Sequence, residues 1–94
     1  MELMVVKDVM LSKSGQTILT GPLLLTEFSR RSEVEQAFGT TVTVSSVDGE
    51  QVLVRVRGVS VSQAMSGSWQ VSLAIDCPSE LSGIALESLV TNEQ

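Results

Sequence analysis

Arginine is the residue type in this sequence whose placement most clearly suggests a chemical role, and that role is binding. Arg30 and Arg31 are adjacent, and Arg55 and Arg57 stand two residues apart within a valine-rich run. Side chains two residues apart on a β-strand point to the same face, so Arg55 and Arg57 could together hold a phosphate, a carboxylate or a partner chain. We predict these four arginines as partner-binding residues. Ion pairing inside the protein or at an interface is favoured over nucleic-acid binding, because few aromatic residues accompany them.

The groups that usually perform acid–base or nucleophilic catalysis are absent or isolated in the sequence. It contains no histidine, which removes the commonest general base and metal ligand. Cys77 is the single cysteine and has no CxxC or histidine partner, so we interpret it as a small, half-buried apolar residue. No P-loop, GxSxG or GxGxxG pattern occurs, and we expect no catalytic, cofactor or metal site. Asp8 and Asp76 would be the only plausible bases of an enzyme, and Asp8 is better explained as a paired or solvated strand residue.

Three other patterns have structural explanations that we prefer to chemical ones. Asp76, Glu80 and Glu87 could form a cation site, but an ordered calcium loop needs several oxygen ligands at closer spacing, so a hydrated acidic surface is expected. The segment Ser12–Gly15 is small and polar and carries one lysine, which superficially suits a phosphate, but it fits a plain turn. Trp69, the only tryptophan, begins an alternating segment and is expected in the core or at an interface.

Size and charge limit the class of protein. The 94 residues can support one core, so we expect residues 1–94 to form a single domain. The net charge of -5 opposes the wrapping of nucleic acid and binding to an anionic membrane, and one cysteine excludes an internal disulfide framework. No apolar run approaches the roughly 18 to 20 residues that a membrane span needs, and the first residues lack the features of a signal peptide. We therefore expect a cytoplasmic protein or, alternatively, a virion component.

The elements that must position these residues begin with two predicted strands. The stretch Leu3–Leu11 is almost wholly apolar and predicts a strand that is buried on both faces or at an interface. A polar turn separates it from a second strand over Thr17–Thr20. That strand ends at Gly21 and Pro22, because proline cannot donate to a sheet.

One helix is predicted after these strands. Thr26–Phe38 is the best candidate, because it has no glycine or proline and Gly39 follows where a left-handed cap would lie. Either Thr26 caps a helix of three turns, or Ser32 and Glu35 form a capping box on a much shorter one.

The next two strands can be tested for register from the alternation of their apolar residues. Apolar residues are even-numbered in Thr41–Ser45 and, most strongly, in Val52–Arg57. A two-residue turn at Asp48–Gly49 would set these faces against each other, whereas a three-residue loop Val47–Gly49 with a left-handed Gly49 aligns them. We predict the three-residue loop. One face would then carry Val42, Val44, Val52, Val54 and Val56, and the other Thr43, Leu53, Arg55 and Arg57.

The second half of the chain continues this pattern with one change of phase. Apolar residues become odd-numbered after Gly58, which predicts a β-bulge or a sharp bend there. Trp69–Asp76 then alternates with odd residues apolar, so the turn around Ser66–Gly67 must also have an odd length. Two such hairpins indicate a coiled, closed sheet. The tail Ser79–Val90 fits either a short helix or a loop followed by a strand that closes a barrel.

Two segments near the start of the chain carry a family resemblance. Lys7-Asp8-Val9-Met10, followed after a short turn by Ser14-Gly15-Gln16-Thr17-Ile18-Leu19-Thr20-Gly21, looks like the opening of the second-domain β-barrel of translation GTPases such as elongation factor Tu. Compatible segments follow in order at Phe38–Val44, Val56–Val61 and Val71–Ile75. The resemblance implies a barrel fold and a binding role.

The sequence also departs from that family and resembles others locally. Thr26–Phe38 stands where the family has a short connection. The 94 residues include no nucleotide-binding domain, so the resemblance does not imply GTP hydrolysis. Val5–Leu24 is similar to the first motif of Sm-like ring proteins, and Val59–Ile75 looks like a strand pair of phage baseplate hub proteins.

These observations lead to one fold and a ranked set of functions. We predict a mainly β protein, a small closed or partly open β-barrel of five to seven antiparallel strands with one helix inserted between strands 2 and 3. The apolar segment Leu3–Met10 and the sparse surface charge predict a non-enzymatic interaction or structural module that acts as a homo-oligomer or binds a protein partner. The alternatives are an RNA- or translation-machinery-binding barrel that uses Arg30, Arg31, Arg55 and Arg57, and a small phage or virion component. We expect no membrane partner.

Overall fold

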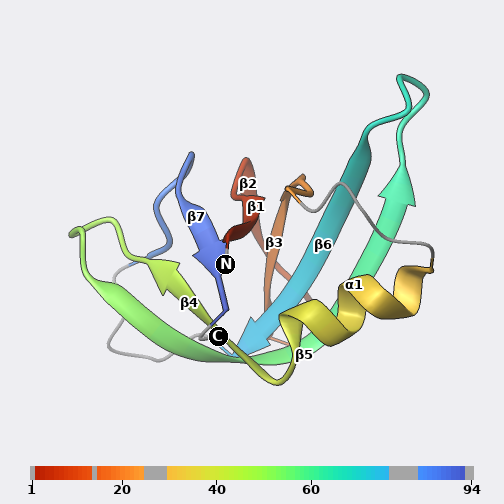
Figure 1. Ribbon diagram of the computed structural model, residues 1–94. Helices are drawn as coiled ribbons and strands as arrows, with labels where there is room; N and C mark the ends of the chain where they lie inside the picture. Colours follow the sequence, from red (N-terminus) through yellow and green to blue (C-terminus); the bar gives the residue numbers. More distant parts are fainter. Residues whose placement is uncertain (1, 14, 25–29, 77–82, 93–94) are drawn as a thin grey trace.

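A single antiparallel sheet dominates the protein, as the sequence predicted. The computed structural model describes residues 2–13, 15–24, 30–76 and 83–92. Within these residues seven strands lie in the order β1-β7-β4-β5-β6-β3-β2, and one helix, α1, lies across β5 (Figure 1). The elements are β1 (Glu2–Val5), β2 (Asp8–Leu11), β3 (Thr17–Pro22), α1 (Arg31–Phe38), β4 (Thr41–Ser45), β5 (Gln51–Gln63), β6 (Trp69–Asp76) and β7 (Leu89–Thr91).

The predicted strand over Leu3–Leu11 is two strands in the structure, because its neighbouring residues bond to different partners. The Val6 N–H donates to Ser88 O at 2.9 Å, beside β7, whereas the Lys7 N–H donates to Thr20 O at 2.8 Å, in β3. β1 therefore pairs with β7, and β2 pairs with β3 at the other end of the strand order. As a result α1 follows the third strand of the chain, although it still lies between the strands at Thr17–Pro22 and Thr41–Ser45; the count differs because the first predicted strand is two.

Burial differs sharply between the two halves of that segment. Leu3 and Met4 are both fully buried in β1, whose register against β7 shifts between Glu2 and Met4. In β2, however, Met10 is 50% exposed and Leu11 is 77% exposed. Of the two predicted alternatives, burial on both faces within the chain is wrong for β2, and its place at an interface stays a prediction.

Helix α1 begins between the two predicted caps, after Thr26 and before Ser32 in the sequence. Arg30 is the N-cap residue, with an extended backbone at φ -138° and ψ 149°, and no side chain caps the helix. Ser32 already lies in the first turn, so the capping box with Ser32 is wrong. Thr26 is not the N-cap and itself lies outside the described residues. Gly39 ends the helix with φ 65°, and its N–H donates to Glu35 O, as the position of this glycine predicted.

The β4–β5 hairpin has the predicted odd loop. Val44 pairs with Val52 and Val42 pairs with Val54. The Ser46 N–H donates to the carbonyl of Glu50 across the loop, and Gly49 has φ 88°. The paired valines therefore share one face, which we call the inner face, while Leu53, Arg55 and Arg57 lie on the outer, exposed face.

The β5–β6 hairpin follows the same rule and contains the predicted bulge. The Ala64 N–H donates to Ser68 O, and Gly67 has φ 90°. The register then shifts between Val56 and Gly58, so that Arg57 is the extra residue of a bulge in β5. The β2–β3 turn repeats the pattern, since the Ser12 N–H donates to Gln16 O. In each of these three hairpins, the N–H of the residue before a three-residue loop donates to the carbonyl of the residue after it.

The core lies between the inner face of the curved sheet and α1. Val34 and Phe38, one turn apart on the helix, are fully buried and belong to the same apolar cluster as the inner-face valines. The largest fully buried side chains are Phe38, Leu3, Met4, Leu19, Leu73 and Ile75.

The end of the described chain is a loop followed by a strand, which is one of the two predicted alternatives. Ile84 bridges Ser46, and β7 then pairs with β1 and, through Thr91, with Thr43 of β4. The residues from 77 to 82, which include Cys77 and the start of the predicted tail, lie outside the described part of the chain.

Contacts also join the two ends of the strand order. β1 and β2 do not pair with each other, so the ladder itself is open. Met4 nevertheless bridges Leu23, just beyond β3, and the Leu24 N–H donates to Leu3 O at 2.9 Å. These two contacts place β1 beside the end of β3.

Gly21 should tolerate no side chain. A Cβ added there would lie 1.7 Å from Val5 O and 2.9 Å from the Val5 carbonyl carbon, both backbone atoms. Gly21→Ala should therefore lower the free energy of unfolding by about 3 kcal/mol or more in guanidinium denaturation. Gly58→Ala is the matched control, because no atom lies within 4 Å of its added Cβ. Equal losses in the two variants would contradict this explanation.

Gly49 should be required because of its positive φ, and not because a side chain there would clash with neighbouring atoms. An added Cβ meets nothing within 4 Å, but φ is 88°, where β-branched residues are strained. Gly49→Val should destabilise the protein by about 1 kcal/mol or more, and Gly49→Asn by clearly less, because asparagine tolerates this conformation. Thermal unfolding of the two variants measures the difference, and equal midpoints would argue against left-handed strain.

Candidate functional site

The four predicted arginines do not form one patch. Arg55 and Arg57 lie on the outer face of β5. Arg30 and Arg31 lie at the start of α1, which packs on the inner face through Val34. All four arginines are exposed, and the two pairs lie on opposite sides of β5.

Arg57 forms an ion pair with Asp76 on the neighbouring strand. Its Nε donates to Asp76 Oδ2 at 2.7 Å, its Nη2 lies 2.6 Å from the same oxygen, and both side chains are nearly half exposed. Arg55 stands directly opposite Asp76 in the β5–β6 register. The preference for ion pairing within the protein is thus confirmed for Arg57. Its position in the bulge brings its guanidinium to a carboxylate that already faces Arg55.

This ion pair shifts both titrations. The hydrogen bond from Arg57 lowers the pKa of Asp76 below its ordinary value, and the charges of Arg57 and Arg55 add to the effect. The same hydrogen bond raises the pKa of Arg57. Because both groups are solvated, the pair orients the two side chains more than it stabilises the fold.

Of the other acidic residues that the sequence singled out, those that the structure describes act separately, and Glu80 lies outside the described residues. Glu87 forms an ion pair with Lys7, with Nζ to Oε2 at 2.6 Å, and Asp76 is engaged with Arg57. Asp8 Oδ1 accepts the Val9 N–H at 2.9 Å, so its partner is backbone. Across residues 2–13, 15–24, 30–76 and 83–92, no cluster of three or more His, Cys, Asp or Glu could hold a metal ion.

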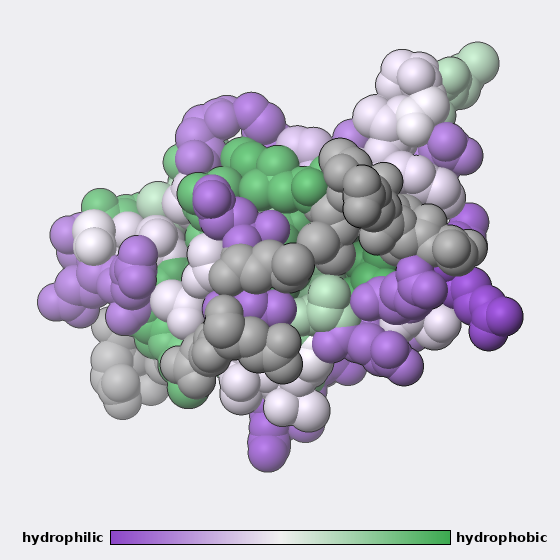
Figure 2. Space-filling view, viewed as in Figure 1, coloured by the Kyte–Doolittle hydropathy of each residue, from purple (hydrophilic) through white to green (hydrophobic). Residues whose placement is uncertain are grey.

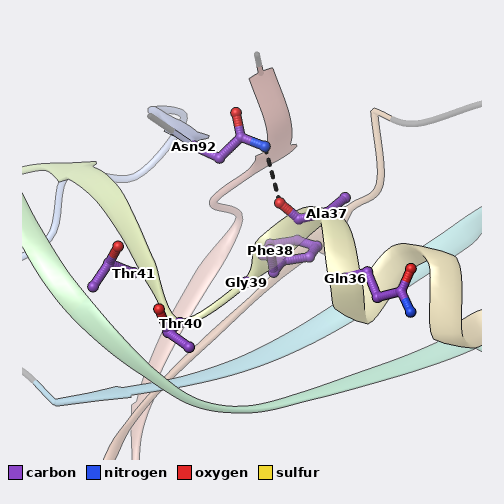
Figure 3. Close-up of a pocket in the computed structure, with 7 residues that line it drawn as sticks. All are labelled: Gln36, Ala37, Phe38, Gly39, Thr40, Thr41 and Asn92. Atoms are coloured by element: carbon purple, nitrogen blue, oxygen red, sulfur yellow. Dashed lines mark hydrogen bonds between the residues drawn. The ribbon is translucent and has the colours of Figure 1, made fainter. Parts of the chain in front are cut away.

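A small cavity that the sequence did not suggest lies at the end of α1. It has a volume of about 240 Å³. Asn92, from the end of β7, donates through Nδ2 to Ala37 O at 2.9 Å, and its Oδ1 is buried without a hydrogen-bond partner (Figure 3). Neutral residues line the cavity, so it can accept a hydrogen-bonding group but offers no side chain for proton transfer. The lining residues are Gln36, Ala37, Phe38, Gly39, Thr40, Thr41 and Asn92.

The outer face carries an uncharged row that the sequence analysis also missed. In the strand registers Met10 stands opposite Ile18, Ile18 opposite Ala74, and Ala74 opposite Gly58. The row therefore crosses four strands, from the edge strand β2 to β5. It could have been found from Met10 and Ile18, the even-numbered apolar residues of β2 and β3. The prediction of one strand over Leu3–Leu11, buried on both faces or at an interface, obscured it.

Other apolar side chains project beyond the sheet. Met65, at the tip of the β5–β6 hairpin, is fully exposed, and Leu11 is the most exposed apolar residue of β2. Figure 2 shows apolar surface over the strands near the centre of the view, around β1 and β2, and a pale apolar tip on the projecting hairpin.

Comparisons with protein-family models, with curated proteins and with solved structures found no match to this chain. The resemblance to the translation GTPase barrel therefore remains a prediction. Among the described residues no helix has the length and apolar character to cross a membrane.

The Arg57–Asp76 ion pair predicts that its contribution to stability depends on pH. The folded pKa of Asp76 is depressed, so the stabilisation from the pair is present above the ordinary carboxyl pKa and is lost as the pH falls through the depressed value. Arg57→Gln should move the pKa of Asp76 back toward its ordinary value, as measured by NMR titration of the Asp76 carboxyl carbon. Arg55→Gln is the matched control and should have a smaller effect. A larger effect of Arg55→Gln would contradict the assignment.

Proposed function

We propose that the protein is a small β-barrel interaction module, without enzymatic activity, that works as a homo-oligomer. The barrel form is supported by the Met4–Leu23 bridge and the Leu24–Leu3 hydrogen bond, which link β1 to the end of β3. With β1 between β7 and this segment, the curved sheet would return on itself and leave β2 as a projecting edge.

The observation that carries the homo-oligomer is the uncharged row on the outer face together with the exposed apolar residues of β2. Met10 and Leu11 occupy half of a four-residue strand and are both exposed in the single chain. Contact with a second protein surface would remove this apolar area from water, at a gain of about 25 cal/mol for each Å².

The charge distribution is compatible with a second copy of the same chain as the partner. Two chains of net charge -5 repel each other, so a contact between copies is best made where each surface is uncharged. The row from Met10 to Gly58 has no charged residue, and the ion-paired Arg57 and Asp76 lie beside it. Self-association at the β2 end of the row would therefore avoid most of the repulsion.

The hypothesis of RNA binding takes second place. It requires Arg30, Arg31, Arg55 and Arg57 to act on one polyanion, yet the two pairs lie on opposite sides of β5. Asp76 also offsets part of the positive charge of the outer pair.

Self-association should appear as a concentration-dependent increase in mass. Sedimentation velocity from low to high micromolar protein should show a growing oligomer for the natural sequence. Met10→Glu, which adds a charge at the β2 end of the row, should weaken it, while Met65→Ser, which removes an exposed apolar residue away from the row, should not. A natural protein that is monomeric and folded at every concentration would contradict the proposal.

A further inference from the structure

The edge of β2 that faces away from β3 pairs with no strand in the described part of the chain, and it suggests how two copies would meet. We infer that two chains pair antiparallel through β2 about a two-fold axis, with Met10 opposite Met10 of the second copy, so that the sheet continues from one chain into the other. This inference rests on the proposed homo-oligomer and adds its contact and register.

The backbone of β2 has an accessible edge. Among the described residues β2 pairs with β3 alone. The Ser12 N–H donates to Gln16 O, and hydrogen-bonded pairs alternate along an antiparallel ladder, so Met10 also directs its peptide groups toward β3. Val9 and Leu11 therefore direct theirs away from the sheet. The hydrogen bond from the Val9 N–H to Asp8 Oδ1, its own neighbour, agrees with this direction.

Symmetry then restricts the register. A two-fold axis perpendicular to the sheet keeps each face on its own side, so residues of equal parity must oppose each other. With Met10 at the axis, Val9 faces Leu11 of the second copy, and both residues have outward peptide groups. Each Val9–Leu11 pair can exchange two hydrogen bonds, and the axis generates a second such pair.

Side chains favour this register over its neighbours. It joins the two Met10 residues, so the uncharged outer rows of both chains become continuous, and it places the exposed Leu11 over the partly buried Val9 on the inner side. Asp8 lies opposite Ser12 of the second copy. Lys7 and Lys13 lie beyond the ends of β2, where Lys7 bonds to β3 through its N–H and to Glu87 through its side chain.

A shift of two residues in either direction loses these contacts. One direction sets Asp8 against Met10, and the other sets Val9 against Lys13, so each alternative register opposes a charge to an apolar side chain. β2 has only four residues, and such a small contact gives a weak, reversible dimer. The Asp8 carboxylate on the Val9 N–H must also be displaced, which further limits the affinity.

Disulfide trapping tests the register directly. In a Cys77→Ser background, Met10→Cys should form a disulfide-linked dimer on mild oxidation, because opposed residues of a non-hydrogen-bonded pair have Cα atoms within disulfide range. Met65→Cys is the matched control, since Met65 is the more exposed methionine and would react faster by random collision. The Met10→Cys dimer should form about tenfold faster than the control at equal concentration, because pairing raises the local thiol concentration.

A second variant covers the case in which Met10→Cys does not fold. Leu11→Lys keeps a long side chain at an exposed position but puts a positive charge at the edge, and should weaken association about tenfold in sedimentation experiments. Trapping of Met10→Cys no faster than Met65→Cys, or association unchanged by Leu11→Lys, would overturn the β2 contact. If the natural protein still associates, only this contact fails. If it does not associate, the proposed homo-oligomer fails as well.

Discussion

The close contact between Gly21 and the backbone of Val5 is the constraint on which the rest of the structure depends. No side chain fits between them, so the first segment of the chain can lie directly against β3. At this point the segment leaves β7 and joins β3, with Val6 bonded to one neighbour and Lys7 to the other. One short apolar stretch thereby supplies buried residues to the core and also an exposed edge strand. A larger residue at position 21 would separate the two ends of the sheet.

The division between the inner and outer faces follows from loop length and one bulge. Three hairpins close with the same hydrogen bond across three residues, so paired strands keep their apolar positions on the inner face. The bulge at Arg57 corrects the change of phase in β5 and also brings that arginine to Asp76. A single irregularity of the strand therefore serves both the core and the polar surface.

The surfaces available for function differ in chemistry. The cavity beside Asn92 has neutral walls, and the outer arginines lie beside the Asp76 carboxylate, which is ion-paired with Arg57, so neither site offers a strong charge to a ligand. The outer row and the edge of β2 combine apolar side chains with backbone groups that need partners. This combination suits contact with another β-strand, since the main chain gives directional bonds and the side chains add burial.

The sequence by itself determined the strand alternation, the odd Val47–Gly49 loop and the end of the helix at Gly39, because each depends on side-chain period or on backbone angles within a few residues. Tertiary structure alone decided the change of partner at Val6 and Lys7, which reflects hydrogen bonds to strands at opposite ends of the sheet. It also decided where α1 begins, because its N-cap residue, Arg30, makes no side-chain capping bond of the kind that a sequence motif predicts. The arginines were predicted to lie on the surface, but their separation was not. Strand period gives the face of each residue, whereas the packing of α1 on the inner face decides which residues meet in space.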